Sequence, residues 1–116
     1  MNLETQSAVA QARQRDLAAR LLAQVEFRRP LVIEAGAGSG KTATLVARVL
    51  AWTLGPGWEE AAARSPRPDP DEEIARRVMR GVLAITFTEA ASSEMAERVG
   101  QGMRAVAAGV LPTAVL

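Results

Sequence analysis

The stretch IEAGAGSGKTATLV, from Ile33 to Val46, constrains the fold more than any other part of this sequence. Its glycine-rich turn lies between the apolar run LVIEA, residues 31–35, and a segment whose apolar residues follow helical spacing. The run follows Pro30 and is rich in β-branched residues, which is typical of a strand buried on both faces. A strand that passes through a glycine turn into a helix is typical of a strand, helix, strand crossover. The sequence therefore predicts an α/β fold with parallel strands.

The rest of the chain can be assigned to the same kind of fold. Apolar residues spaced by four predict an amphipathic helix over 6–27. VLAITF, residues 82–87, has the composition of a second buried strand. A further helix is expected from Glu89 onward, because Met95, Val99, Met103 and Val106 follow helical spacing. Residues 55–80 are rich in Pro, Glu, Asp and Ala and predict an exposed excursion, with a short helix over 71–79. We therefore expect parallel strands with flanking helices in a three-layer α/β/α arrangement.

Length and composition limit the class of protein. A chain of 116 residues predicts one domain or a piece of one, so residues 1–116 are taken as a single, incomplete domain. Cysteine and histidine are absent, which excludes disulfides, structural zinc and catalysis by either side chain. A net charge of +1 neither indicates nor excludes nucleic acid. No apolar run approaches the roughly 18 residues of a membrane span and no signal-peptide layout is present, so we expect a cytoplasmic protein with no membrane contact.

The glycine turn has the chemistry of a phosphate site. Backbone N–H groups at the start of a helix, together with the positive end of the helix dipole, surround an anion. The Lys41 ammonium is expected to reach the β and γ phosphates, and the Thr42 hydroxyl to complete the shell of a magnesium ion. Lys41 is the only lysine among 14 Lys and Arg residues. The predicted site comprises Ala35, Gly36, Ala37, Gly38, Ser39, Gly40, Lys41 and Thr42, of which Lys41 and Thr42 are the catalytic candidates.

The first position of this loop departs from the common pattern GxxxxGKT, since Ala35 stands where that pattern has glycine. The stretch AGAGSGKT fits the form AxxGxGKT at every specified position. That form resembles the phosphate loop of superfamily 1 helicases of the UvrD, Rep and RecB type. The resemblance implies a partial P-loop NTPase domain of the RecA-like kind that binds ATP and Mg²⁺.

A second motif resembles the same family. AITFTEAASSEMAERV, from Ala84 to Val99, is similar to the helicase pattern TFTxxAAxEM, and its form TFTEAA is closer to the RecB and AddA branch than to UvrD. In such helicases this segment lines the single-stranded DNA track, which implies DNA contacts by Thr86, Phe87 and Thr88. A hydroxyl can bond a phosphate and a ring can stack on a base. The alternative is structural, with Thr88 as a helix N-cap and Phe87 in the core.

The family also carries a glutamine upstream of the phosphate loop that reads the adenine edge. Gln14 is the candidate for this role, because the Asp-x-x-x-Arg-like layout after it resembles RecB-like chains. Gln6 and Gln11 are alternative candidates for the same role. The alternative for each is a glutamine on a helix surface without a ligand.

The resemblance as a whole implies the N-terminal portion of a DNA helicase that serves repair or recombination. No strand ending in Asp-Glu follows 82–87, so we expect this chain alone to bind Mg-ATP weakly and not to hydrolyse it or unwind DNA. Its expected partners are single-stranded DNA, in the complete protein, and the remainder of the motor or a partner chain. Two alternatives stay open: a small P-loop phosphotransferase and a non-catalytic, ATP-binding remnant.

Overall fold

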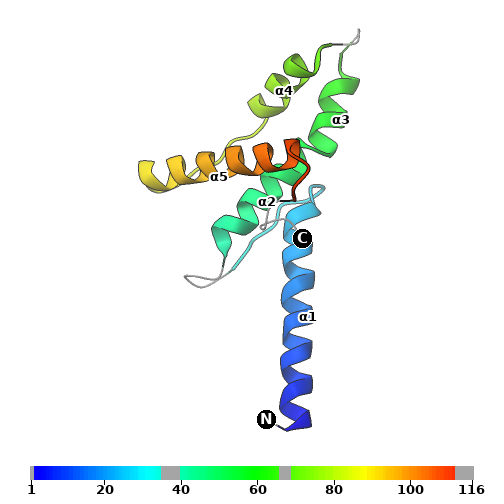
Figure 1. Ribbon diagram of the computed structural model, residues 1–116, viewed down its shortest axis with the longest axis vertical. Coiled ribbons are helices and arrows are strands. Elements are labelled where there is room, and N and C mark those ends of the chain that lie inside the picture. Colours follow the sequence, from blue (N-terminus) through cyan, green and yellow to red (C-terminus); the bar gives the residue numbers. More distant parts are fainter. Residues whose placement is uncertain (1, 35–39, 66–68, 112–116) are drawn as a thin grey trace.

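The described part of the chain forms five helices in succession (Figure 1). The computed structural model describes residues 2–34, 40–65 and 69–111. The helices are α1 (Leu3–Val25), α2 (Lys41–Thr53), α3 (Pro56–Ala63), α4 (Asp71–Arg80) and α5 (Glu89–Ala107).

The prediction of an α/β fold with a parallel sheet is wrong. Residues 31–34 and 82–87 were expected to be parallel strands of a three-layer, RecA-like P-loop domain, but none of the described residues is in a strand. Among these residues no backbone hydrogen bond links the two segments. Val32, Leu83 and Ile85 leave 89%, 85% and 87% of their surface exposed. A strand exists only through hydrogen bonds to a neighbouring strand, and here neither apolar segment has one.

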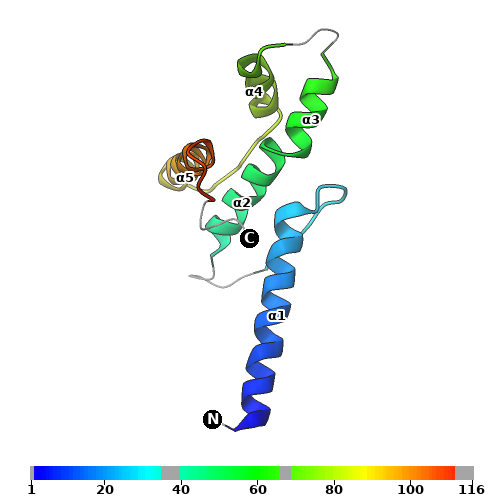
Figure 2. The same ribbon diagram turned by 45° about the vertical axis from the view of Figure 1, so that its right-hand side comes forward.

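Helix α1 projects away from the other four helices, with its N-terminus at the far end of the molecule (Figures 1 and 2). The molecule is accordingly long, 62 × 31 × 30 Å. Asn2 begins α1 by accepting a hydrogen bond from the Thr5 amide at 2.8 Å. Only Ala23 and Gln24 are buried in α1, at the end that packs on α2. The expected apolar stripe at 17, 21 and 25 is exposed instead, because α1 has a packing partner only near its C-terminus.

The end of α1 is tied to α2 by Arg48. Its Nη1 donates to the backbone oxygen of Ala23 at 2.7 Å, and its guanidinium lies over the ring of Phe27, 4.9 Å from the ring centre. The Phe27 ring in turn meets Trp52 edge-on, with 5.2 Å between ring centres. One arginine of α2 therefore holds both the last turn of α1 and the segment that follows it.

The main core lies where α2 and α5 cross. Val46, Leu50 and Val99 are buried together, and Met95 and Met103 pack against them. Helical periodicity predicted these residues of α5, but α2 was expected to pack on a sheet. In the structure α2 packs on α1, α5 and α3.

Helices α3 and α4 form a second, smaller cluster. Ala61 of α3 meets Ile74 and Val78 of α4, and Trp58 covers them. The predicted helix at 71–79 corresponds to α4, whose acidic first turn and basic last turn suit the helix dipole. Helix α3 was not predicted.

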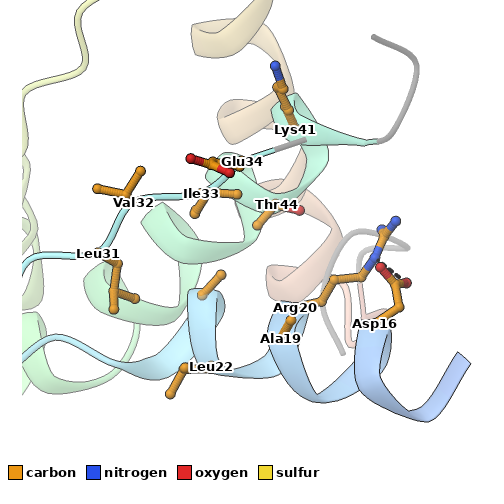
Figure 3. Close-up of a pocket in the computed structure, with 11 residues that line it drawn as sticks. Asp16, Ala19, Arg20, Leu22, Leu31, Val32, Ile33, Glu34, Lys41 and Thr44 are labelled. Carbon is orange, nitrogen blue, oxygen red and sulfur yellow. Dashed lines mark hydrogen bonds and ion pairs between the residues drawn. The ribbon is translucent and has the colours of Figure 1, made fainter. Parts of the chain in front are cut away.

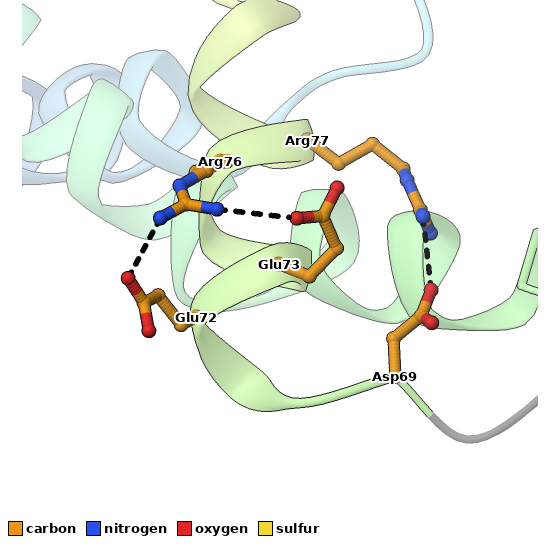
Figure 4. A network of polar contacts seen from close by, with 5 residues as sticks. All are labelled: Asp69, Glu72, Glu73, Arg76 and Arg77. Atoms are coloured by element: carbon orange, nitrogen blue, oxygen red, sulfur yellow. Dashed lines mark hydrogen bonds and ion pairs between the residues drawn. The ribbon is translucent and has the colours of Figure 1, made fainter.

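Polar contacts link α4 to α3 and to the segment between them, and Figure 4 shows those that α4 makes with Asp69 and within itself. Arg77 of α4 donates to the Ala61 backbone oxygen at 3.1 Å and to the Asp69 carboxylate at 2.9 Å, and the Ser65 hydroxyl donates to Asp69 at 2.7 Å. These hydrogen bonds, that of Ser65 first, hold the pKa of the Asp69 carboxyl below its ordinary value of 3.8. Arg76 pairs with Glu72 and Glu73 on the outer face.

No helix in the described ranges is long and apolar enough to cross a membrane.

Candidate functional site

The start of α2 is where the sequence places the phosphate site. Gly40 is its N-cap, with φ at 86°, a left-handed conformation that favours glycine. No side chain of a described residue caps this end, and the first turn contains no acidic residue. The amides of the first turn therefore point outward with the positive end of the helix dipole. The Thr44 hydroxyl donates to the Gly40 backbone oxygen at 3.0 Å and steadies the first turn.

The two predicted catalytic residues both lie in this first turn. Lys41 is exposed, and within the part of the chain that the structure describes its ammonium makes no ion pair or hydrogen bond. Thr42 is half-buried. The other predicted residues of the loop, Ala35, Gly36, Ala37, Gly38 and Ser39, lie outside the described residues.

A pocket of about 350 Å³ lies between α1, residues 31–34 and the start of α2 (Figure 3). This volume is in the range of small-molecule sites, roughly 300 to 1,000 Å³. Charged side chains of both signs line it together with apolar ones. The charged residues are Asp16, Arg20, Glu34 and Lys41.

Arg20 is one of the charged residues of this pocket to which the sequence assigned no role, and it belongs to the Asp-x-x-x-Arg-like layout that follows Gln14. Its Nε donates to the Asp16 carboxylate at 2.8 Å, an ion pair one turn apart on α1. The terminal nitrogens lie beside Gly40, since a Cβ built on that glycine would be 3.2 Å from Arg20 Nη1. The spacing of four residues is the signal from which this ion pair could have been predicted. Its position at α2 depends on how α1 packs, which no local pattern reports.

Gln14 lies on α1, exposed, and does not line this pocket. Gln6 and Gln11 lie on α1 as well and are also exposed. The adenine contact of Gln14 therefore stays a prediction.

The second motif lies at the start of α5. Thr88 is the N-cap and accepts a hydrogen bond from the Ala91 amide at 3.0 Å, as the structural alternative expected. The Thr86 hydroxyl donates to the Thr88 backbone oxygen at 2.9 Å. The Phe87 side chain is fully exposed, so the expectation that it lies in the core is wrong. An aromatic ring in this position is available to a ligand.

The described residues contain no group of three or more Asp or Glu side chains placed to hold a metal ion.

Comparison with known proteins identifies the family. Residues 17–112 match the model of the UvrD/REP helicase N-terminal domain. An ATP-dependent helicase/nuclease of Moorella thermoacetica has a subunit that is 33% identical over 88 residues, 75% of this chain, and the corresponding Clostridium kluyveri protein is 40% identical over 73 residues, 63% of this chain. The RecB subunit of the RecBCD enzyme of Escherichia coli is 43% identical over 68 residues, 59% of this chain.

The matched segments are short parts of these relatives, about 5%, 4% and 5% of their lengths. No solved structure matches the chain. The family match nevertheless covers both motifs, the turn before α2 and the start of α5. The chain therefore belongs to the UvrD/REP helicase N-terminal domain family.

Proposed function

We propose that this chain supplies the ATP-binding N-terminal portion of a superfamily 1 DNA helicase of the RecB and AddA type. In the complete protein, ATP hydrolysis would drive movement along single-stranded DNA and strand separation, in repair or recombination. Two lines of evidence support this: membership of the UvrD/REP family, and relatives named as subunits of ATP-dependent helicase/nuclease enzymes. These relatives favour a helicase over a small phosphotransferase.

The observation that carries the proposal is the start of α2. A left-handed glycine N-cap is followed at once by a lysine with no ionic partner among the described residues. We assign phosphate binding to the backbone and side chains of residues 35–42, with the Lys41 ammonium on the β and γ phosphates. The first-turn amides of α2 and the Lys41 charge fit a phosphate group, because both favour an anion and neither is neutralised by another described residue.

Magnesium fits the site only as a companion of ATP. The Thr42 hydroxyl can supply one ligand, and phosphate oxygens and water would supply the others, as is usual for this ion. Bound Mg-ATP would supply the phosphoanhydride bond whose hydrolysis drives the motor. The residues of this chain hold and orient the phosphates.

The DNA contact is assigned to the start of α5. The exposed Phe87 ring is free to stack on a base, and Thr86 and Thr88 flank it with hydroxyl groups. In the structure both hydroxyls already take part in local hydrogen bonds that shape this turn. Phe87 is therefore the residue on which the assignment depends most.

The test is a titration of this chain with Mg-ATP, followed by calorimetry, for the parent and the Lys41→Ala variant. Loss of a charge-assisted contact predicts a Kd raised about tenfold or more. Arg80→Ala is the matched control, because Arg80 is an exposed cation on α4 outside the pocket, and it should leave the Kd unchanged.

Thermal unfolding should be the same in all three proteins, since neither side chain is buried. Equal affinity in Lys41→Ala and the parent would contradict the proposal. Absence of any Mg-ATP binding by the parent would also contradict the proposal, whereas Mg-ATP binding that Lys41→Ala leaves unchanged would favour the non-catalytic, ATP-binding remnant. ATP turnover with transfer of phosphate to a second small substrate would favour the phosphotransferase.

A further inference from the structure

We infer that Arg20 of α1 is a second cation for the phosphates of the bound nucleotide, in addition to Lys41. This inference rests on the proposed nucleotide site at α2. It adds a residue that lies outside the glycine loop and to which the Asp-x-x-x-Arg-like layout after Gln14 gave no role of its own.

The position of the guanidinium is the first argument. Arg20 is far from Gly40 in the sequence, yet its Nη1 and Nη2 would be 3.2 Å and 3.9 Å from a Cβ built on that glycine. Arg20 also lines the pocket that Lys41 lines. Arg20 therefore places positive charge directly at the turn where the phosphates are proposed to bind.

The orientation of the side chain is the second argument. Its Nε is held by Asp16 at 2.8 Å, and Figure 3 shows the two side chains facing each other on α1. Because the guanidinium is a planar fork, fixing one edge on a carboxylate fixes the direction of the terminal nitrogens. Other ion pairs one turn apart, such as Arg98 with Glu94, are surface pairs of small value for stability. The pair at Arg20 differs because its guanidinium reaches a second helix.

The local charge is the third argument. A cation is unfavourable at the N-terminus of a helix, which is already positive. Two cations lie at this end of α2, and its first turn holds no acidic residue. Asp16 and Glu34 also line the pocket; Asp16 pairs with Arg20, whereas Glu34 makes no ion pair with Arg20 or Lys41 within the described ranges. An anion with several oxygens, such as a triphosphate, would interact favourably with both cations at once.

The experiment compares Mg-ATP and AMP as ligands of four proteins: the parent, Arg20→Gln, Arg20→Lys and Lys41→Ala. For Arg20→Gln we expect the Kd of Mg-ATP to rise about tenfold, because one charge-assisted hydrogen bond to the phosphates is lost. The Kd of AMP should change less. Arg20→Lys should recover part of the affinity, because it keeps the charge without the fork. Arg13→Gln is the matched control, since Arg13 is exposed on α1 and outside the pocket, and it should bind as the parent does.

The outcomes separate this inference from the proposed function. If Lys41→Ala weakens Mg-ATP binding and Arg20→Gln does not, Arg20 is not a phosphate contact and the nucleotide site remains. If neither variant changes the Kd, both proposals fail. If Arg20→Gln weakens Mg-ATP and AMP equally, the residue does not act on the added phosphates and the inference is overturned.

Arg20→Lys keeps the inference testable if Arg20→Gln loses helix content by circular dichroism. A folded Arg20→Lys that binds Mg-ATP more tightly than Arg20→Gln supports a contact made through charge. A folded Arg20→Lys that binds no better than Arg20→Gln would overturn it.

Discussion

Gly102 of α5 lies directly against Leu50 of α2. A Cβ built on Gly102 would be only 2.5 Å from Leu50 Cδ1, closer than two carbon atoms can approach. Leu50 is 2% exposed and lies at the centre of the main core. The absence of a side chain at Gly102 is therefore what allows the two helices to cross at this distance.

Replacing Gly102 by alanine should destabilise the protein. Overpacking a core costs about 1 to 3 kcal/mol, whereas the better helix propensity of alanine returns up to about 1 kcal/mol. We expect the free energy of unfolding, measured with urea, to fall by about 1 kcal/mol. Gly100→Ala is the control on the same helix, because its Cβ would meet only the flexible end of Arg104, at 3.3 Å. A Gly102→Ala variant as stable as Gly100→Ala would show that the crossing can relax.

The contacts of Arg48 allow a prediction about the packing of α1 on α2. Arg48→Lys keeps the positive charge but cannot both donate to the Ala23 backbone oxygen and lie flat over Phe27. We expect a loss of about 1 to 2 kcal/mol in the free energy of unfolding, the combined size of one hydrogen bond and one cation–π contact. The control is Arg98→Lys, whose arginine makes an exposed ion pair with Glu94. Equal stability of the two variants would mean that Arg48 does not stabilise the packing of α1 on α2.

The low pKa of Asp69 predicts how stability depends on acidity. The folded pKa lies below the ordinary value of 3.8, which the unfolded chain is taken to have. The ionised carboxylate therefore stabilises the fold above that value, and this contribution is lost as the pH falls through the folded pKa. Asp69→Asn removes the titrating group.

We expect the parent to lose more stability than Asp69→Asn as the pH falls from about 5 to about 2, since the other carboxyls titrate in both proteins. Urea unfolding at a series of pH values measures the difference. If the free energy of unfolding depends on pH in the same way in both proteins, the Ser65 and Arg77 contacts with Asp69 do not stabilise the fold.

The sequence predicted helices better than it predicted their surroundings. Helix α4 and the core positions of α5 follow from periodicity and charge. Helix α3 was missed because Pro56 and Gly57 are typical helix breakers, although proline is favourable in the first turn of a helix. The prediction of a sheet was wrong because the composition of a segment indicates a tendency to be buried, whereas strand pairing depends on residues elsewhere in the fold.

In the candidate site, too, local features were predicted and contacts between distant residues were not. The start of α2 at Gly40 and Lys41 was predicted from the motif, which is local. Arg20 enters the site only through the packing of α1 on α2, and the exposure of Phe87 follows from the absence of a covering element among the described residues. Local chemistry is readable in a sequence, whereas the neighbours of a residue across the fold are not.

Phe87 allows the DNA contact to be tested without disturbing the fold. Because its side chain is fully exposed, Phe87→Ala should leave the free energy of unfolding within about 0.5 kcal/mol of the parent. Loss of a ring that stacks on a base should weaken binding of a fluorescent single-stranded oligonucleotide by about 1 to 3 kcal/mol, measured by anisotropy at fixed salt. Leu83→Ala is the matched control, since Leu83 is also exposed and apolar but has no ring to stack on a base. If both variants bind the oligonucleotide equally well, the start of α5 is not a base-stacking surface, and the exposure of Phe87 needs another explanation.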